Sequence, residues 1–446
     1  MIKVRTRFAP SPTGSMHIGS LRTALYAYAL AKHYKGDFLL RIEDTDKKRE
    51  VTGSKEKIQE TLKFFKLNWD EELVIQSDRV KKGIYKEAAE KLVKEGHAFY
   101  CQCDAKNAKE DGFSSQLRDS CRDKNLSSGA IKLKVNDNEI ISFQDFVVNK
   151  KISWNTSTVS DATLLKSDGF PTYHLAVVVD DSDMKISHLL RGHDWMPSTP
   201  IHLLVYKYLG LKMPEIGHLT DILDPEGGKL SKRKGSVSVD AMLEEGYLAD
   251  AILNFIMLLG WAPKDNKEIF SLDEFVEVFD EKGFQKANPV FNREKLNWFN
   301  GMYLRTLKDS DLVNLLFVFS KGKYSRDILE KTVPLVKERI DTLSDYWEIA
   351  SFFYEDNKAD ETLFGENKEK HLNVAYEVLE GMDNWDKETL NQKLMEGVTD
   401  NSFKTGDFFM DLRIAITGKK FTPPINDSIF ILGKEKSLER IKEYIK

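Results

Sequence analysis

Residues 7–20 read RFAPSPTGSMHIGS, and this stretch decides the fold of the 446-residue chain. The residues that lead into it, 3–8, alternate in side-chain character as a strand does, whereas the prolines and glycine of residues 10–14 require a turn or loop. Apolar side chains then recur at helical spacing over residues 21–29, and residues 38–42 are an apolar run typical of a buried strand. The opening of the chain is therefore predicted to be a βαβ unit.

A βαβ unit at the start of the chain indicates an open parallel sheet in an α/β protein. Ligands of such sheets bind beyond the carboxyl ends of the strands, where residues 9–17 and 43–46 are both expected to lie. These two polar loops should therefore border one crevice.

The length and composition are those of an ordinary globular protein with several domains. At 446 residues the chain exceeds the usual size of one hydrophobic core, so roughly two to four domains are expected. With 41% hydrophobic and 31% charged residues, disorder is excluded as an overall description. The net charge of -5 argues against a protein that coats nucleic acid through its overall charge, but a local basic face remains open.

The three cysteines, Cys101, Cys103 and Cys121, favour a reducing compartment, because an odd number so close together does not suit a disulfide framework. The most apolar stretch, residues 251–262, is too short to span a bilayer, and residues 1–8 lack the apolar core of a secretory signal. We therefore expect a cytoplasmic protein that is not inserted in a membrane.

The rest of the chain changes character twice. From about residue 101 to residue 154 it is irregular and polar, as an insertion between two halves of a sheet is. Strong apolar runs return at residues 173–179 and 203–208. Beyond about residue 309 successive amphipathic helices are expected, so the C-terminal part is predicted to be a helical module.

The loop at residues 9–17 has the features of an anion site. It places His17 and Gly19 at the start of a helix, where unpaired backbone N–H groups and the positive end of the helix dipole attract phosphate. The alternative is a purely structural histidine that caps the helix. A second basic element, residues 228–235 (GKLSKRKG), carries four cations between glycines and suits a mobile cradle for polyphosphate, with a solvated charged loop as its alternative.

Together the two elements resemble the two signatures of class I aminoacyl-tRNA synthetases, usually called HIGH and KMSKS. The signatures are similar to residues 17–20 (HIGS) and 229–233 (KLSKR), in the order and at the separation found in that family. Residues 9–14 (APSPTG) and 41–46 (RIEDTD) resemble the glutamyl branch of the family rather than the glutaminyl branch. Ser20 replaces the final His of the general signature, at a position where the glutamyl branch commonly varies.

The resemblance covers nearly the whole chain, is strongest to bacterial-type members, and weakens only in the cysteine-bearing insertion. It implies an α/β fold: a Rossmann-like class I synthetase catalytic domain with an inserted acceptor-binding lobe, followed by a mostly α-helical C-terminal half. The expected domains are the first half of the catalytic domain at 1–100, the acceptor-stem-binding lobe at 101–170, the second half of the catalytic domain at 171–225, a stem-contact domain with the KMSKS-like loop at 226–310, and a helical anticodon-binding domain at 311–446.

The implied function is that of a glutamate–tRNA ligase. Such an enzyme activates L-glutamate with ATP and Mg²⁺ to glutamyl-adenylate and transfers the glutamyl group to the 3′-terminal ribose of tRNA(Glu). Positioning and charge stabilisation, rather than a Ser or Cys nucleophile, would drive both steps. A monomer is the family expectation.

The resemblance also implies the roles of individual residues. Glutamate brings two carboxylates and one ammonium group, so its site needs about two guanidinium partners and one acidic partner. Which arginine takes which carboxylate stays open. The implied catalytic residues are His17 and Lys232, the implied ATP-binding residues are His17, Gly19, Asp194, Trp195, Lys229, Lys232 and Arg233, and the implied glutamate-binding residues are Arg7, Ala9, Ser11, Glu43, Tyr173 and Arg191.

The cysteines resemble the zinc site of some glutamyl-tRNA synthetases. In that site the last ligand is a His, whereas the matching residue here is Asp123. The predicted ligands are therefore Cys101, Cys103, Cys121 and Asp123, and the alternative is three reduced cysteines without a metal.

The sequence opposes two alternative functions. A truncated relative that glutamylates a modified tRNA base lacks the helical anticodon module that some 130 residues here supply. A retired synthetase kept for tRNA binding is opposed by the intact His17, Arg191 and Lys232. Arg339 resembles an arginine that reads the last anticodon base in enzymes restricted to glutamate tRNA, with a solvated helix arginine as its alternative, so charging of tRNA(Gln) stays open.

Overall fold

The computed structural model describes residues 3–103, 117–230, 237–356 and 358–445 of the chain. The chain divides into two compact units, Met1–Leu243 with Ala249–Arg293, and Glu244–Leu248 with Glu294–Lys446. The predicted lysine and arginine of the second basic loop, Lys232 and Arg233, lie outside the described residues.

The first unit opens with the predicted βαβ unit. Strand β1 (Arg5–Phe8) pairs in parallel with β2 (Asp37–Ile42), and α1 (Ile18–His33) connects them. β2 in turn pairs in parallel with the short β3 (Val74–Ile75). A Cβ on Gly36 would lie 1.9 Å from the backbone oxygen of Val4, so only glycine fits where the chain turns from α1 into β2.

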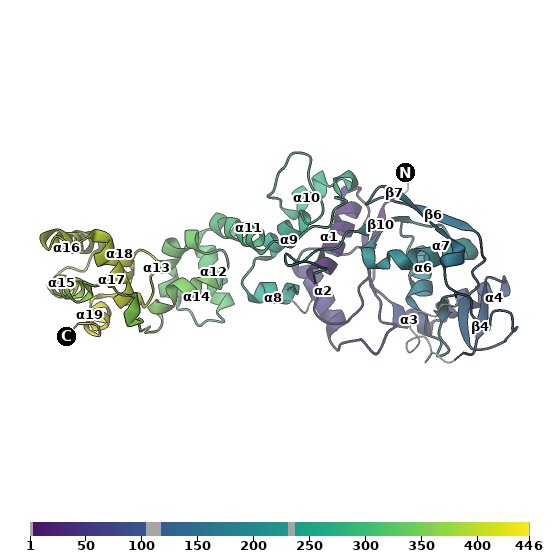
Figure 1. The fold of residues 1–446 in the computed structure, drawn as a ribbon, viewed down its shortest axis with the longest axis horizontal. Helices are drawn as coiled ribbons and strands as arrows, with labels where there is room; N and C mark the ends of the chain where they lie inside the picture. Colours follow the sequence, from purple (N-terminus) through teal and green to yellow (C-terminus); the bar gives the residue numbers. More distant parts are fainter. Residues whose placement is uncertain (1–2, 104–116, 231–236, 357, 446) are drawn as a thin grey trace. The chain divides into compact units, whose positions relative to one another are not determined.

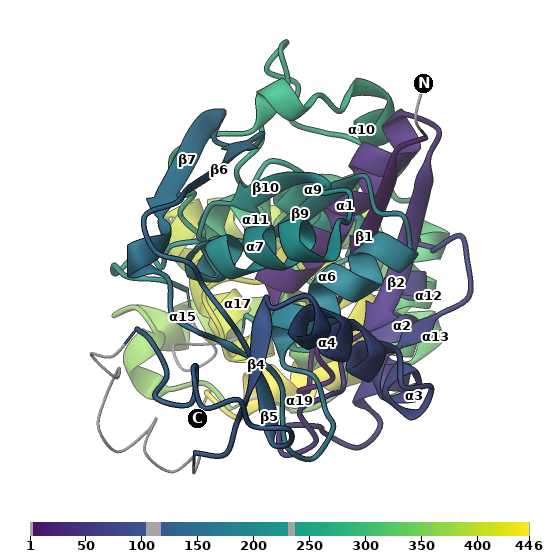
Figure 2. The same ribbon diagram turned by 90° about the vertical axis from the view of Figure 1, so that its right-hand side faces the viewer.

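A second sheet continues this layer in the order β7-β6-β10-β9 (Figure 2). β10 is parallel to β9 and to β6, and β6 and β7 form an antiparallel hairpin at the edge. The backbone N–H of Ser187, just before β9, donates to the backbone oxygen of Arg5 at 2.9 Å, so β9 lies beside β1. These strands are β6 (Ile140–Asp145), β7 (Lys150–Asn155), β9 (His188–Gly192) and β10 (Glu215–Leu219).

The predicted insertion contributes to two sheets. β4 (Ala98–Cys101), β5 (Ala130–Leu133) and β8 (Thr163–Leu165) form a small antiparallel sheet, whereas β6 and β7 belong to the sheet with β9 and β10. The described part of this insertion belongs to the first unit. The five domain boundaries expected from the sequence therefore stay predictions.

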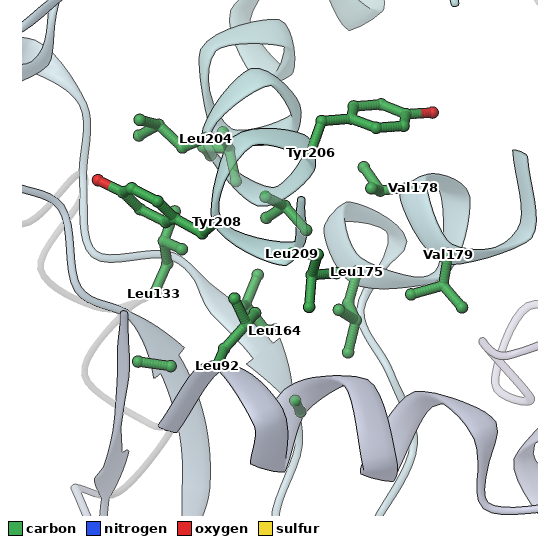
Figure 3. Close-up of a cluster of buried hydrophobic side chains, with 14 of the residues drawn as sticks. Leu92, Leu133, Leu164, Leu175, Val178, Val179, Leu204, Tyr206, Tyr208 and Leu209 are labelled. Atoms are coloured by element: carbon green, nitrogen blue, oxygen red, sulfur yellow. The ribbon is translucent and has the colours of Figure 1, made fainter. Parts of the chain in front are cut away.

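A large apolar core holds together helices and strands between residues 85 and 209 of the first unit (Figure 3). Helices α4 (Ile84–Lys94), α6 (Tyr173–Asp183) and α7 (Thr199–Leu209) contribute Leu92, Leu175 and Leu204 to it, and β5 and β8 contribute Leu133 and Leu164.

The other helices in the described part of the first unit are α2 (Ser54–Phe64), α3 (Gln76–Lys81), α8 (Val239–Glu244), α9 (Ala249–Met257) and α10 (Leu272–Val278), with 3-10 turns η1 (Thr156–Thr158), η2 (His193–Ser198) and η3 (Glu281–Gly283).

Helix α1 is fixed at its middle by Tyr26. The Tyr26 hydroxyl donates to backbone oxygens near the end of α9, the nearest being that of Leu259 at 3.1 Å, and its ring packs edge-on against Phe284. Because His17 is the N-cap residue of α1, this packing also helps to fix the position of His17.

The second unit is helical throughout its described residues, as predicted for the chain beyond about residue 309 (Figure 1). Two apolar cores hold it, one around α12–α14 and one around α15–α19. Its elements are α11 (Arg293–Thr306), α12 (Asp309–Phe319), α13 (Arg326–Val336), η4 (Lys337–Arg339), α14 (Asp345–Ala350), η5 (Ser351–Phe353), η6 (Glu361–Leu363), α15 (Lys368–Glu380), α16 (Lys387–Asp400), α17 (Thr405–Thr417), α18 (Ile425–Leu432) and α19 (Lys434–Lys442). Within the described ranges, none of the helices is both long and apolar enough to cross a membrane.

Candidate active site

A cleft of about 460 Å³ opens in the first unit where β1, β2 and β9 end. This is the place where ligands of parallel sheets bind. Each described residue that the sequence assigned to ATP or glutamate lines this one cleft, although the residues come from segments up to 222 positions apart. They are Arg7, Ala9, Ser11, His17, Gly19, Glu43, Tyr173, Arg191, Asp194, Trp195 and Lys229.

His17 caps α1 and also lines the cleft. It is the N-cap residue, and its Nδ1 accepts a hydrogen bond from the backbone N–H of Gly19 at 3.1 Å. A neutral imidazole that accepts at Nδ1 carries its proton at Nε2, from which it can donate. The capping role that was the alternative for His17 is therefore compatible with a role toward phosphate.

Gly19 keeps the first turn of α1 open. A Cβ at this position would lie 3.4 Å from His17 Nδ1 and 3.9 Å from the Ile222 side chain, both of which border the cleft. With no side chain here, a ligand can approach the N–H groups at the positive end of the helix dipole.

A buried ionic network holds Arg7 and Glu43, which line the cleft. Arg7 grips Asp181 with two hydrogen bonds, from Nε at 3.1 Å and from Nη2 at 3.2 Å. Arg41 donates to the same carboxylate from Nη1 at 2.6 Å and to Glu43 from Nη2 at 2.9 Å. Asp180 completes the network with its own partner Arg79 at 2.6 Å. Asp181, to which the sequence assigned no role, is therefore the residue that holds Arg7 in place.

Glu43 and Tyr173 each have a pKa raised by burial. For Glu43 the guanidiniums of Arg41 and Arg7 act in the opposite direction. For Tyr173 the raised pKa keeps the phenol protonated, so that its hydroxyl can donate to a ligand while it accepts from Arg191 Nη1 at 3.3 Å.

Arg191 differs from the arginines of this network. It is the last residue but one of β9, it is 5% exposed, and it lines the cleft. Arg7, Arg41 and Arg79 pair with four carboxylates, those of Glu43, Asp180, Asp181 and Asp183. Among the described residues, by contrast, no carboxylate lies within 4.0 Å of the Arg191 guanidinium, whose acceptors are Tyr173, Thr199, His202 and His218. The cleft thus holds one buried positive charge that the surrounding side chains do not neutralise.

An aromatic pair and the ion pairs of Lys229 also line the cleft. The rings of Tyr173 and Trp195 lie 3.9 Å apart with an interplanar angle of 32°. Lys229 forms ion pairs with Asp194 and, at 2.9 Å, with Asp221. Lys229 therefore brings the start of the second basic loop to the cleft.

The cysteines gather as predicted, but with a different carboxylate. The ligand atoms of Cys101, Cys103, Asp119 and Cys121 all lie within 4.8 Å of one another. Asp123 is outside this group, because its side chain is 83% exposed and pairs with Lys134 at 3.3 Å. Tetrahedral zinc with Zn–S distances near 2.3 Å needs ligand atoms about 3.8 Å apart, so three thiols and the Asp119 carboxylate fit the metal.

Arg339 lies in η4 of the second unit with its side chain exposed. Its Nη1 is 3.5 Å from the backbone oxygen of Thr422, to which Arg413 also donates at 3.1 Å. Burial, followed by the charge of Arg339, lowers the pKa of Arg413. Two cations therefore share one edge of this unit.

Comparisons with known proteins cover nearly the entire chain. The family of class I tRNA synthetases (E and Q), catalytic domain, matches residues 3–298, and an anticodon binding domain family matches residues 302–445. A glutamate–tRNA ligase of Clostridium tetani is 40% identical in an alignment of 475 positions that covers 99% of this chain and 97% of that protein. One from Dehalococcoides mccartyi is 37% identical over 473 residues, covering 98% and 97% of the two chains.

Solved structures agree with these relatives. The crystal structure of a glutamate tRNA ligase from Elizabethkingia meningosepticum in complex with its amino acid superimposes with a TM-score of 0.85 at 32% identity, covering 99% of both chains. A glutamate–tRNA synthetase from Elizabethkingia anophelis gives a TM-score of 0.84 over the same shares. The chain therefore belongs to the bacterial-type glutamyl-tRNA synthetases, within the class I tRNA synthetases of the E and Q type.

Proposed function

We propose that the cleft activates L-glutamate with ATP and then passes the glutamyl group to the 3′-terminal ribose of tRNA(Glu). One observation carries this proposal: a helix start with His17 and a buried arginine without a carboxylate partner, Arg191, line the same cleft. The first suits the phosphates of ATP, and the second suits an anionic amino acid.

Glutamate would bind with its side-chain carboxylate on Arg191 and its α-carboxylate near Arg7. Arg191 has no acidic partner among the described residues, so a substrate carboxylate supplies its counter-ion. Arg7 already donates from both Nε and Nη2 to Asp181, so it would bind the α-carboxylate more weakly than Arg191 binds the side-chain carboxylate. A loosely held α-carboxylate stays nucleophilic, as the reaction requires. Glu43 would bind the ammonium group, and the Tyr173 hydroxyl would orient the side chain.

Activation joins an α-carboxylate oxygen to the α-phosphorus of ATP while the bond to the β-phosphate breaks and diphosphate leaves. His17 Nε2–H and the N–H groups at the start of α1 would stabilise the charge that develops on the phosphate. Lys229, followed by Lys232 and Arg233, would neutralise the departing diphosphate, with Mg²⁺ bound to ATP. Trp195 and Asp194 would border the nucleotide.

Transfer requires the tRNA end to reach the adenylate. A neighbouring cavity of about 750 Å³ shares Glu43, Tyr173 and Trp195 with the cleft. It is also lined by Lys47 and by other cations, which suit the phosphates of the terminal nucleotides. There the terminal ribose hydroxyl would attack the adenylate carbonyl, AMP would leave, and the hydroxyl proton would be released.

Two further elements of the proposal lie outside the cleft. Arg339 would read the last anticodon base and so favour tRNA(Glu), since it is exposed and adds its charge to that of Arg413. Zinc would be held by Cys101, Cys103, Cys121 and Asp119, and would fix the loop that carries them.

The ligase function is tested by glutamate-dependent exchange of diphosphate into ATP in the presence of tRNA, with glutamine as the control amino acid. Exchange is expected with glutamate and not with glutamine, and the absence of exchange with glutamate would overturn the proposal.

Charging of purified tRNA(Glu) and tRNA(Gln) by the wild type and by Arg339→Gln tests the proposed anticodon contact of Arg339. Efficient charging of tRNA(Gln) by the wild type would contradict it.

A further inference from the structure

Among the described residues, the buried Arg191 guanidinium donates only to neutral acceptors. Its Nε donates to His218 Nε2 at 3.0 Å, its Nη1 to His202 Nδ1 at 3.0 Å, and its Nη2 to Thr199 Oγ1 at 2.8 Å. A buried arginine is usually paired with a carboxylate, as Arg7 is with Asp181. The surroundings of Arg191 thus fix its position without cancelling its charge.

The contacts determine the protonation of both imidazoles. A guanidinium can only donate, so the ring nitrogen that faces Arg191 must be an unprotonated acceptor in each histidine. His218 therefore carries its proton on Nδ1, from which it donates to Asp145 Oδ2 at 2.7 Å. His202 carries its proton on Nε2, from which it donates to His174 Nδ1 at 3.2 Å.

The groups around each ring keep it neutral. Burial lowers the pKa of His202, and the charge of Arg191 lowers it further. Burial also lowers the pKa of His218, against the opposite effect of Asp145. His174 faces His202, and burial lowers its pKa to about 4.

Asp145 anchors one side of this arrangement. It ends β6, is fully buried, and accepts from the backbone N–H of Val147 at 3.0 Å and from that of His218 at 3.2 Å, as well as from the His218 ring. His218 and Arg191 are directly paired positions of the parallel strands β10 and β9. The contacts of Arg191 are therefore built into the sheet.

We propose that His202 and His218 are positioning residues that determine specificity: they orient Arg191 as neutral acceptors and leave its charge for the side-chain carboxylate of the amino acid. This inference rests on the proposed binding of glutamate at Arg191. A carboxylate in place of either imidazole would supply the counter-ion from the protein, and a neutral side chain such as that of glutamine would then compete better.

His202 offers a matched pair of variants. Asn and Asp both place an oxygen where Nδ1 accepts from Arg191, and they differ by one negative charge. The titratable groups that act most on His202 are Arg191, His174, His218 and Arg7, none of which is a carboxylate, so an Asp here meets no like charge from them.

The experiment measures diphosphate exchange with tRNA present, and determines kcat and KM for glutamate and for glutamine. His202→Asn is expected to keep the KM for glutamate within about threefold. His202→Asp is expected to raise it about 10²-fold, as loss of a desolvated charge contact does. The kcat at saturating glutamate should change less than tenfold, and the ratio of kcat/KM for glutamate to that for glutamine should fall about 10²-fold.

Equal KM values for His202→Asn and His202→Asp would overturn the inference. The charge of the side chain at position 202 would then have no effect on glutamate binding. If His202→Asp does not fold, His218→Gln and His218→Ala replace the pair, since Gln keeps an acceptor for Arg191 Nε and Ala does not. The KM for glutamate should then be about tenfold higher for Ala than for Gln, and equal values would again refute the role. A wild type without glutamate-dependent exchange would refute the proposed function itself.

Discussion

Replacing Asp181 with Asn removes the carboxylate that two buried arginines share. Asp181 is 1% exposed and accepts from Arg41 Nη1 at 2.6 Å and from Arg7 Nε at 3.1 Å. Burial opposes ionisation of this carboxyl, but the guanidiniums of Arg41 and Arg7 outweigh it, so the pKa of Asp181 is lowered. An Asn amide would keep one acceptor and turn an N–H group toward a guanidinium.

The size of the effect follows from burial. Removing one partner of a buried ion pair costs about 3–5 kcal/mol, because the other charge stays buried without compensation. In a unit of nearly 300 residues, each kcal/mol shifts the melting temperature by about 2 °C. Asp181→Asn is therefore expected to lower the Tm by about 6–10 °C in scanning calorimetry of the full chain.

Asp183 provides the matched control. It lies on the same helix, α6, and pairs with Arg79, but its side chain is 52% exposed. Exposed ion pairs contribute about 0–1 kcal/mol, so Asp183→Asn should lower the Tm by less than about 2 °C. Equal shifts for the two variants would refute the reasoning that burial makes the Asp181 contacts strong.

Three further predictions concern pH, metal and catalysis. Burial lowers the pKa of His174 to about 4, whereas the unfolded value lies near 6.5. The folded state therefore keeps its full stability with respect to this group above pH 6.5 and loses stability as the pH falls toward 4. The loss amounts to about 2 kcal/mol at pH 5. His174→Asn should remove that part of the acid destabilisation in urea unfolding at pH 7.5 and 5, and an unchanged pH dependence would contradict it. Purified protein should contain close to one zinc per chain, Cys101→Ser and Asp119→Ala should each reduce that content, and a wild-type content below about a tenth of an equivalent would end the zinc proposal. His17→Ala and Lys232→Ala should each slow adenylation by about 10²-fold or more in single-turnover assays, whereas near-normal rates would remove these residues from the catalytic roles.

Local patterns were sufficient to predict the first βαβ unit and the place of the cleft. The helical spacing over residues 21–29 and the apolar run at residues 38–42 became α1 and β2. The loops at their ends border the cleft because parallel strands end at one edge of a sheet. Amphipathic periodicity likewise predicted the helical second unit.

The contacts that tune the cleft were not predictable, because they depend on strand register and on pairs far apart in sequence. His218 meets Arg191 only because β10 pairs with β9 in one particular register, which neither strand encodes by itself. Asp119 replaces Asp123 in the cysteine group for a similar reason. Asp119 also pairs with Lys132 of β5, and spacing along the chain from Cys121 gives no sign of this contact.

The contact between β1 and β9 affects how the protein is synthesised. The backbone hydrogen bond that links these strands joins Ser187 to Arg5, so one edge of β1 stays unpaired until the ribosome has made more than 180 further residues. At about 5–20 residues per second this takes roughly 10–40 s. An unpaired strand edge is a template for association with other chains, so a chaperone that binds this part of the nascent chain would protect the edge of β1 until β9 has been made.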